Sequence, residues 1–266
     1  MYDRFKRKIT YLRISVTDRC NLRCTYCMPE EGIHLLEHKD ILSYEEIIQV
    51  VKVAVNLGVN KIRITGGEPL VRKGITDLIS GISQITGIRD ISMTTNGILL
   101  DDFAEKLASA RLNRVNISLD TIDPFKYKEI TRGGDIEKVF AGIHAARKAG
   151  LDPIKINCVV MQSSSEKDAI EVKKFGMENG LEVRFIHQMN LMTGEFSIVE
   201  GGSGGDCERC NRLRLTANGL VKPCLFSNMG YNVRKMGIKE ALLKAVNHKP
   251  ESGTLNCSNQ FYNIGG

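Results

Sequence analysis

The sequence predicts an α/β protein built on six consecutive strand–helix units and followed by a small cysteine-bearing module. Three observations lead to this fold class. Short runs rich in β-branched and apolar residues alternate with stretches that place apolar side chains at helical spacing. The 266 residues, 42% of them hydrophobic, suit one large domain or one domain with a small appendage. The alternation stops after Gln188, and the segment Met192–Gly205 that follows is rich in Gly and Ser.

Six short segments are predicted as strands because β-branched or apolar side chains dominate them. Strands that alternate with helices pair in parallel through right-handed crossovers. Six units are too few for the eight-stranded barrel, so the sheet forms an open doubly wound layer or a barrel, full or partial. In each arrangement, functional residues gather at the carboxyl ends of the strands. The predicted strands are residues 10–16, 61–65, 90–95, 114–119, 154–161 and 182–188.

Helices are predicted between these strands. The first has the clearest boundaries: Ser43 with Glu46 three residues later is a capping-box pattern, and Gly58 marks the end. The apolar positions 47, 48, 51 and 55 between them follow helical spacing. The other predicted helices are residues 76–85, 102–110, 136–149 and 166–178.

Composition narrows the class of protein. The formal net charge is +6, but the basic residues form no run typical of nucleic-acid tails, so a small phosphorylated ligand fits better than DNA. The apolar runs are too short to span a bilayer and no apolar signal region follows the N-terminus, so we expect a cytoplasmic protein without a membrane partner. Thiols stay reduced there, and six of the eight cysteines form two tight groups, which indicates metal ligation.

The first group, Cys20, Cys24 and Cys27, follows the first predicted strand with the spacing C-x3-C-x2-C. Thiolates are the soft ligands that iron–sulfur clusters require. Three ligands leave one iron of a [4Fe–4S] cluster open for the amino and carboxylate groups of S-adenosylmethionine (SAM). A structural zinc site usually has four ligands in paired C-x2-C form, which this group lacks.

This motif resembles the radical SAM superfamily, and the surrounding sequence is similar, more narrowly, to the GTP 3′,8-cyclase family of molybdenum-cofactor biosynthesis. The resemblance implies a partial (β/α)6 TIM-type barrel over residues 1–190, the radical SAM core. It also implies a C-terminal module over residues 191–266, with an auxiliary [4Fe–4S] cluster and a Gly-Gly tail. The matching segments are residues 11–20, 63–70, 94–97, 116–120, 155–157, 210–216, 223–226 and 264–266.

The resemblance also implies site residues. SAM would contact the Gly66-Gly67-Glu68-Pro69 loop and Met189. Without the resemblance, the loop would be interpreted as a simple turn and Met189 as a core residue. Arg212 and Arg214 alternate in a strand-like run and therefore face one side, where guanidinium groups suit phosphate. The implied SAM-binding residues are Tyr26, Gly66, Gly67, Glu68, Ser118 and Met189; the implied GTP-binding residues are Arg13, Arg63, Thr94, Lys155, Arg212, Leu213 and Arg214; the implied catalytic residues are Arg212, Arg214 and the tail residues Gly265 and Gly266.

The second group, Cys207, Cys210 and Cys224, leaves two interpretations open. By spacing it is three quarters of a zinc ribbon, with Cys257 or His248 as the nearest fourth ligand. By resemblance it holds a second [4Fe–4S] cluster whose open iron binds the guanine of GTP. If Cys257 ligates that cluster, the open iron disappears and the cluster serves electron transfer or structure.

The reaction implied by the resemblance is hydrogen abstraction from ribose C3′ of GTP by a 5′-deoxyadenosyl radical, attack on C8 of guanine, and formation of 3′,8-cyclo-7,8-dihydro-GTP. A reductant such as flavodoxin or ferredoxin would supply electrons, and a homodimer is compatible with the family. The chain departs from the family at His187, which replaces Glu, at the short segment 190–206, and at Cys257. These departures keep an alternative open: a related radical SAM enzyme acting on a peptide or another nucleotide. A non-catalytic zinc or iron–sulfur protein would leave the Gly-Gly-Glu-Pro loop unexplained.

Overall fold

The computed structural model describes residues 1–257 and Ile264. Its strands are β1 Tyr11–Ser15, β2 Lys61–Thr65, β3 Asp90–Thr95, β4 Arg114–Ser118, β5 Lys155–Val160, β6 Glu182–His187, β7 Arg212–Leu215, β8 Leu220–Lys222 and β9 Tyr231–Asn232. Its helices are α1 Tyr44–Asn56, α2 Ile75–Ser83, α3 Leu100–Ser109, α4 Pro124–Thr131, α5 Ile136–Lys148, α6 Lys167–Glu178, α7 Val233–Met236 and α8 Ile238–Asn247, with a short 3-10 helix at Pro69–Val71.

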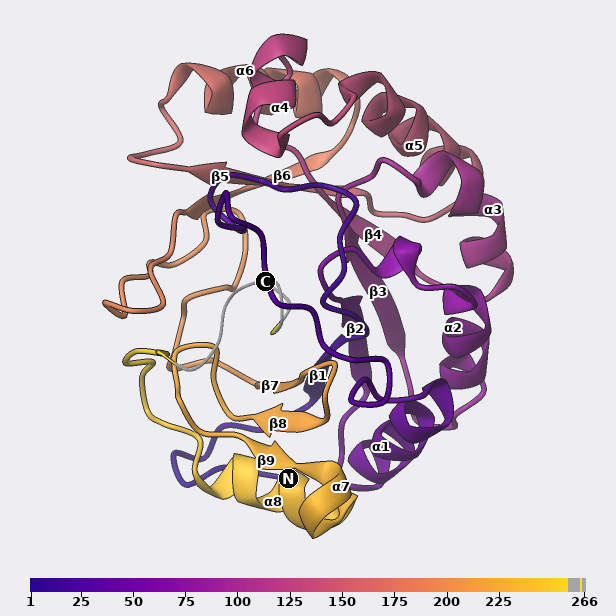
Figure 1. Ribbon diagram of the computed structural model, residues 1–266, viewed down its shortest axis with the longest axis vertical. Coiled ribbons are helices and arrows are strands. Elements are labelled where there is room, and N and C mark those ends of the chain that lie inside the picture. Colours follow the sequence, from indigo (N-terminus) through magenta and orange to yellow (C-terminus); the bar gives the residue numbers. More distant parts are fainter. Residues whose placement is uncertain (258–263, 265–266) are drawn as a thin grey trace.

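The strands of the described residues form one sheet in the order β6-β5-β4-β3-β2-β1-β7-β8-β9. Strands β1 to β6 run parallel to their neighbours, and β7 pairs in parallel with β1 at the other edge. Figure 1 shows the sheet curving around a central space while helices α1 to α6 cover its outer side. The predicted partial (β/α)6 barrel is therefore confirmed, in the open form.

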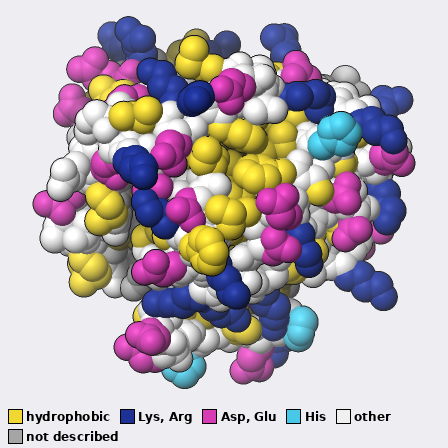
Figure 2. Space-filling view, turned by 90° about the horizontal axis from the view of Figure 1, so that it is seen from above, with side chains coloured by type: hydrophobic (Ala, Val, Ile, Leu, Met, Phe, Trp, Pro, Cys, Tyr) yellow, Lys and Arg dark blue, Asp and Glu magenta, His cyan; other side chains and the backbone are white. Residues whose placement is uncertain are grey.

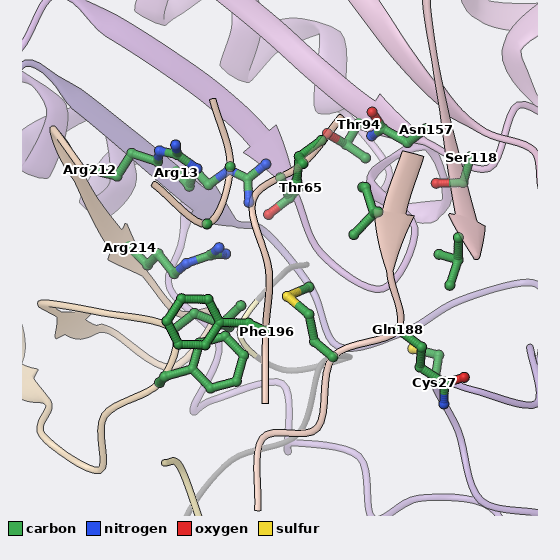
Figure 3. Close-up of a pocket in the computed structure, with 18 of the residues that line it drawn as sticks. Arg13, Cys27, Thr65, Thr94, Ser118, Asn157, Gln188, Phe196, Arg212 and Arg214 are labelled. Atoms are coloured by element: carbon green, nitrogen blue, oxygen red, sulfur yellow. The ribbon is translucent and has the colours of Figure 1, made fainter. Parts of the chain in front are cut away.

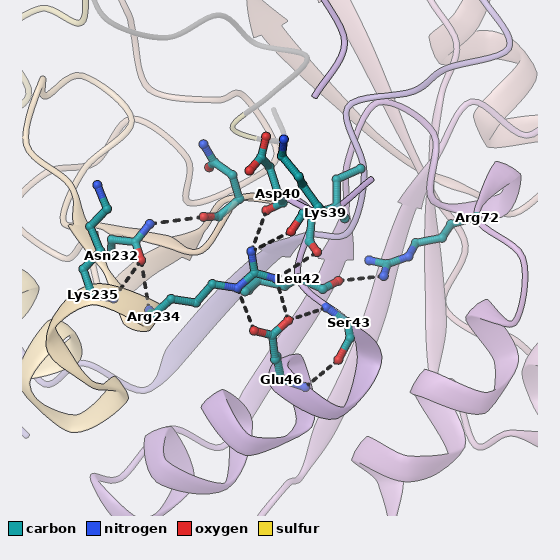
Figure 4. Close-up of polar contacts among 11 residues, drawn as sticks. Lys39, Asp40, Leu42, Ser43, Glu46, Arg72, Asn232, Arg234 and Lys235 are labelled. Atoms are coloured by element: carbon teal, nitrogen blue, oxygen red, sulfur yellow. Dashed lines mark hydrogen bonds and ion pairs between the residues drawn. The ribbon is translucent and has the colours of Figure 1, made fainter. Parts of the chain in front are cut away.

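The segment predicted as a C-terminal module adds strands to this same sheet. Strands β8 and β9 continue from β7 in antiparallel pairing, and α8 packs beside them and α1. Arg234 on α7 links this region to the start of α1: Nε and Nη2 donate to the Glu46 carboxylate at 2.7 and 2.8 Å (Figure 4). The same carboxylate accepts from the backbone N–H of Ser43, which completes the predicted capping box.

The main core lies between the sheet and its outer helices. Alternate residues of each strand face it, as β7 illustrates: Leu213 and Leu215 are fully buried in the core, whereas Arg212 and Arg214 line the cavity on the inner side. A second, smaller cluster of buried apolar residues lies by the cavity and consists of Leu191, Leu225, Phe226 and Ile264. The inner face of the sheet is thus left for polar and charged side chains.

Helix α4 was not predicted, because only Tyr127 and Thr131 of its eight residues are buried and no apolar stripe marks it. Its start is nevertheless fixed locally, since the Asp123 carboxylate caps it and Pro124 occupies its first position.

In the described part of the chain, no helix is both long and apolar enough to cross a membrane. The face seen from above carries charged side chains of both signs around a central group of hydrophobic ones (Figure 2).

Candidate active site

A cavity of about 330 Å³ opens on the inner side of the sheet and brings both cysteine groups together: it extends from the carboxyl end of β1, where the first group lies, to the amino end of β7, where the second lies. Figure 3 shows Arg13, Arg212 and Arg214 on one side of it and Ser118 and Asn157 on the other. Its lining includes Cys20, Cys24, Cys27, Cys207, Cys210 and Cys224, and, among the predicted residues, Arg13, Tyr26, Gly66, Gly67, Thr94, Ser118, Met189, Arg212 and Arg214. Segments 200 residues apart in sequence therefore face one space.

The first cysteine group sits in a tight turn after β1. The carbonyl oxygen of Cys24 accepts hydrogen bonds from the N–H groups of Cys27 and Met28, both at 3.0 Å. The Cys20 sulfur accepts from the Leu22 N–H at 3.4 Å and from Asn96 Nδ2 at 3.8 Å. Such N–H···S contacts are among those that stabilise iron–sulfur thiolates.

Burial raises the pKa of the Cys24 and Cys27 thiols to about 12. Ligation by iron deprotonates such thiols, because a metal ion supplies the positive charge that the buried site lacks. In the described residues, no three His, Cys, Asp or Glu side chains converge closely enough to hold a single metal ion. The Cys20 sulfur, which accepts two N–H contacts, fits the role of a thiolate ligand of an iron–sulfur cluster.

The Gly66-Gly67-Glu68 loop packs directly against this turn. A Cβ on Gly67 would lie 2.4 Å from the Arg19 carbonyl oxygen, so only glycine fits there. Glu68 turns away from the cavity and is fully buried; it accepts from Leu70 N–H, Thr95 Oγ1 and Asn96 N–H at 3.0, 2.8 and 2.7 Å. Burial raises the pKa of Glu68 to about 7. Its carboxyl group thus anchors the loop to the end of β3.

Tyr26, between the last two cysteines of the group, is held by Asp120 at the end of β4. The Tyr26 hydroxyl donates to Asp120 Oδ2 at 2.8 Å, and Asp120 Oδ1 accepts from the Val159 N–H at 2.8 Å. Burial raises the pKa of Asp120. Asp120 was not predicted as a site residue, although it ends the Asn116-Ile-Ser-Leu-Asp segment that the resemblance used.

Three arginines stand side by side on adjacent strands. Arg13 of β1 is in register with Arg63 of β2 and with Arg214 of β7. Burial lowers the pKa of Arg63 to about 10, and burial with the charges of Arg13 and Arg212 lowers the pKa of Arg214 well below its usual value. Arg13 Nε is buried without a hydrogen-bond partner in the described residues. Of the three, Arg13 and Arg214 line the cavity, so an anion in it would lie beside two adjacent guanidinium groups.

Not every predicted binding residue reaches the cavity. Arg63 is buried below it, where it donates to Ser92 Oγ at 3.3 Å. Lys155 forms an ion pair with Glu182 on the next strand, and Leu213 faces the core. Gly265 and Gly266 lie outside the described residues. Arg184 of β6 was not predicted, but its charge acts on Arg63 and its Nε is buried without a hydrogen-bond partner in the described part of the chain.

The second cysteine group spans the loop before β7 and the segment after β8. Burial raises the pKa of Cys224. The pKa of Cys210 is lowered, because the positive charge of Lys249 and a backbone N–H outweigh the effect of burial there. Cys257 is exposed, does not line the cavity, and donates its N–H to Asn228 Oδ1 at 2.8 Å.

The short segment 190–206 forms part of the cavity wall. Phe196 stacks on Phe226 with ring centroids 4.5 Å apart, and both line the cavity. His187, the residue that departs from the family, also lines it and lies with Nε2 3.2 Å from Glu200 Oε1. A carboxylate is therefore still present beside this position, supplied by a different residue.

Comparisons with known proteins agree with this geometry. The model of the radical SAM superfamily matches residues 14–176. The GTP 3′,8-cyclase of Thermodesulfovibrio yellowstonii is 42% identical over 305 aligned positions that cover 94% of this chain and 95% of that protein. That of Clostridium botulinum strain Hall is 40% identical over 319 positions covering all of both chains, so it has residues that this chain of 266 lacks.

Solved structures show the same fold at low identity. Streptococcus suis SuiB bound to S-adenosylmethionine has a TM-score of 0.66 at 18% identity, over 92% of this chain and 65% of that one. The structure of anSMEcpe with bound AdoMet has a TM-score of 0.63 at 17% identity, over 91% of this chain and 78% of that one. At this identity the likeness concerns the fold alone.

Proposed function

The chain belongs to the radical SAM superfamily and, within it, to the GTP 3′,8-cyclase family, and from this premise we propose that it converts GTP to 3′,8-cyclo-7,8-dihydro-GTP in molybdenum-cofactor biosynthesis. One observation carries the proposal: two three-cysteine groups and a row of arginines face a single cavity. A radical-generating site and a polyanion site so placed suit a phosphorylated substrate.

The first group would hold the cluster and SAM. When bound to Cys20, Cys24 and Cys27, a [4Fe–4S] cluster supplies the electron that cleaves SAM to methionine and a 5′-deoxyadenosyl radical. Gly67 lets the loop backbone lie against the cysteine turn, and Tyr26 is fixed by its hydrogen bond to Asp120. These contacts orient the wall against which SAM would bind.

GTP would bind with its triphosphate at Arg13, Arg212 and Arg214. Guanidinium groups bind phosphate oxygens in bidentate fashion, and burial strengthens the attraction. The guanine end would then point toward Cys207, Cys210 and Cys224, which line the same cavity. The exposed position of Cys257 supports three protein ligands for a second cluster and hence an open iron there.

The stacked Phe196 and Phe226 would make an apolar wall for this space. Excluding water protects a reactive radical from side reactions. An external one-electron donor of the flavodoxin or ferredoxin type would supply the reducing equivalent.

Anaerobic incubation of the reconstituted protein with SAM, a reductant and GTP tests the proposal. We expect 5′-deoxyadenosine together with a cyclised GTP product, and neither from Cys24→Ala. If deoxyadenosine forms equally fast without GTP and no GTP is consumed, the cyclase assignment fails. Iron analysis should give about eight irons per chain for two clusters, whereas zinc without iron would contradict both sites. Cys257→Ala should leave the spectrum of the second cluster unchanged.

A further inference from the structure

Lys249, just after α8, is a fully buried lysine beside the second cysteine group. Only 1% of its surface is exposed, and it lines the cavity. Its Nζ donates to the carbonyl oxygen of Arg212 at 2.8 Å and to that of Pro223 at 2.7 Å. Arg212 follows Cys210 by two residues, and Pro223 directly precedes Cys224. One ammonium group therefore joins the two segments that carry these cysteines.

The charge of the same group acts on the thiols of the second cysteine group. Lys249 lowers the pKa of both Cys210 and Cys224, against the effect of burial, which raises it. An ammonium group has three donors, and the two carbonyl oxygens accept from two of them, which leaves one for a cluster-bound sulfur. Both of these acceptors are neutral carbonyls rather than a carboxylate, although a buried charge is costly without a counter-charge. Thiolates bound to a cluster would supply that negative charge.

We propose that Lys249 is a positioning residue for the second cluster. Lys249 fixes the spacing of Cys210 and Cys224 and stabilises the reduced state of the cluster bound there. The inference rests on the second cluster of the proposed function. Charge and hydrogen bonds to the sulfurs both set the potential of an iron–sulfur cluster. A positive charge at the sulfurs favours the state with the extra electron, so Lys249 raises the reduction potential.

Another buried lysine shows what is particular about this one. Lys222 on β8 is also fully buried and Cys224 acts on its pKa, yet its Nζ has no hydrogen-bond partner in the described residues. It therefore joins no two segments. Lys244 on α8 offers a matched surface control, because it is half exposed and its Nζ is paired with Glu240 at 2.8 Å.

The test is a redox titration of the reconstituted, full-length protein followed by electron paramagnetic resonance, with iron analysis, for the parent, Lys249→Met, Lys249→Gln, Lys249→Arg and Lys244→Met. Lys249→Met should shift the midpoint potential of the second cluster to a more negative value and lower the iron content from about eight toward about four per chain. Lys249→Arg keeps the positive charge, so the second cluster should have the midpoint potential of the parent. The first cluster, and both clusters in Lys244→Met, should keep the potentials of the parent.

If Lys249→Met fails to fold, Lys249→Gln carries the measurement, because it keeps a donor but no charge and should retain iron with a lowered potential. A neutral variant that keeps both the iron and the potential of the parent overturns the inference and leaves the second cluster standing. A parent with about four irons and one cluster signal overturns the second cluster itself, and the inference with it. The two failures are therefore distinguishable.

Discussion

Replacing Arg13 with Met removes one charge from the middle of the proposed triphosphate site while keeping a long side chain. Arg13 lies in register between Arg63 and Arg214, faces the cavity, and has a buried Nε without a hydrogen-bond partner in the described residues. A hydrogen bond to a charged group contributes about 1.5–3 kcal/mol. At about 1.4 kcal/mol per decade, Arg13→Met should weaken GTP binding about 10- to 100-fold. Relief of repulsion among the remaining arginines offsets part of the loss, so the lower end is expected.

The affinities of the anaerobic protein for GTP and for guanosine are measured at equilibrium, each at low and high salt. This comparison distinguishes the loss of a phosphate contact from a general loss of nucleoside binding. Guanosine has no phosphate, so its affinity should stay unchanged, and the salt dependence of GTP binding should fall. Arg89→Met, at an exposed position before β3, should match the parent. Equal weakening of GTP and guanosine, or parent-like binding of GTP, would refute the reasoning.

Three further changes test the scaffold of the site. Gly67→Ala places a methyl group 2.4 Å from the Arg19 carbonyl oxygen of the first cysteine turn, so the first cluster should lose iron and SAM cleavage should stop. In the control Gly230→Ala, the nearest atom to the new methyl group is 3.5 Å away, and this variant should behave as the parent. A normal iron content in Gly67→Ala would contradict the prediction. Arg7→Met leaves the buried Asp3 carboxylate without the ion pair at 2.6 Å and should cost about 3–5 kcal/mol of unfolding free energy, seen as a lowered midpoint of thermal unfolding; an unchanged midpoint would count against it. Burial raises the pKa of Glu68 to about 7, so the folded state holds its proton more tightly than the unfolded state between about pH 4.5 and pH 7. The unfolding free energy should therefore fall by up to about 3 kcal/mol as the pH rises through that window. Glu68→Gln should flatten this slope in thermal unfolding at several pH values, and equal slopes in the two proteins would exclude the assignment.

Much of the fold could be predicted because local signals and tertiary structure agree. Every strand from β1 to β6 falls within its predicted range, and α1 begins at the predicted capping box. Parallel pairing follows from the alternation of strands and helices alone. By contrast, the pairing of β7 with β1 joins segments some 200 residues apart, and no local pattern specifies such a partner. The role of β7 to β9 in the same sheet was therefore out of reach of the sequence.

The candidate site divides in the same way. Cysteine spacing identified residues whose chemistry is rare, and those cysteines do face one cavity. Residues that act by holding others were missed: Asp120 behind Tyr26, Lys249 behind Cys210. A lone Asp or Lys in a sequence usually lies in solvent, so nothing marks one that is buried. Predicting Lys249 would have required knowing that α8 ends beside the second cysteine group.

The pairing of β1 with β7 explains why two distant motifs can serve one reaction. Strand β1 carries Arg13 and leads into Cys20, while β7 carries Arg214 and starts just after Cys210. Parallel register places Arg13 beside Arg214, so the cysteine loops at the two strands are held on either side of the same basic row. Adjacent strands are only about 4.8 Å apart. A slip of one residue in this register would turn Arg212 and Arg214 into the core and Leu213 into the cavity. The burial of Leu213 and Leu215 therefore keeps Arg212 and Arg214 of the proposed phosphate site facing the cavity.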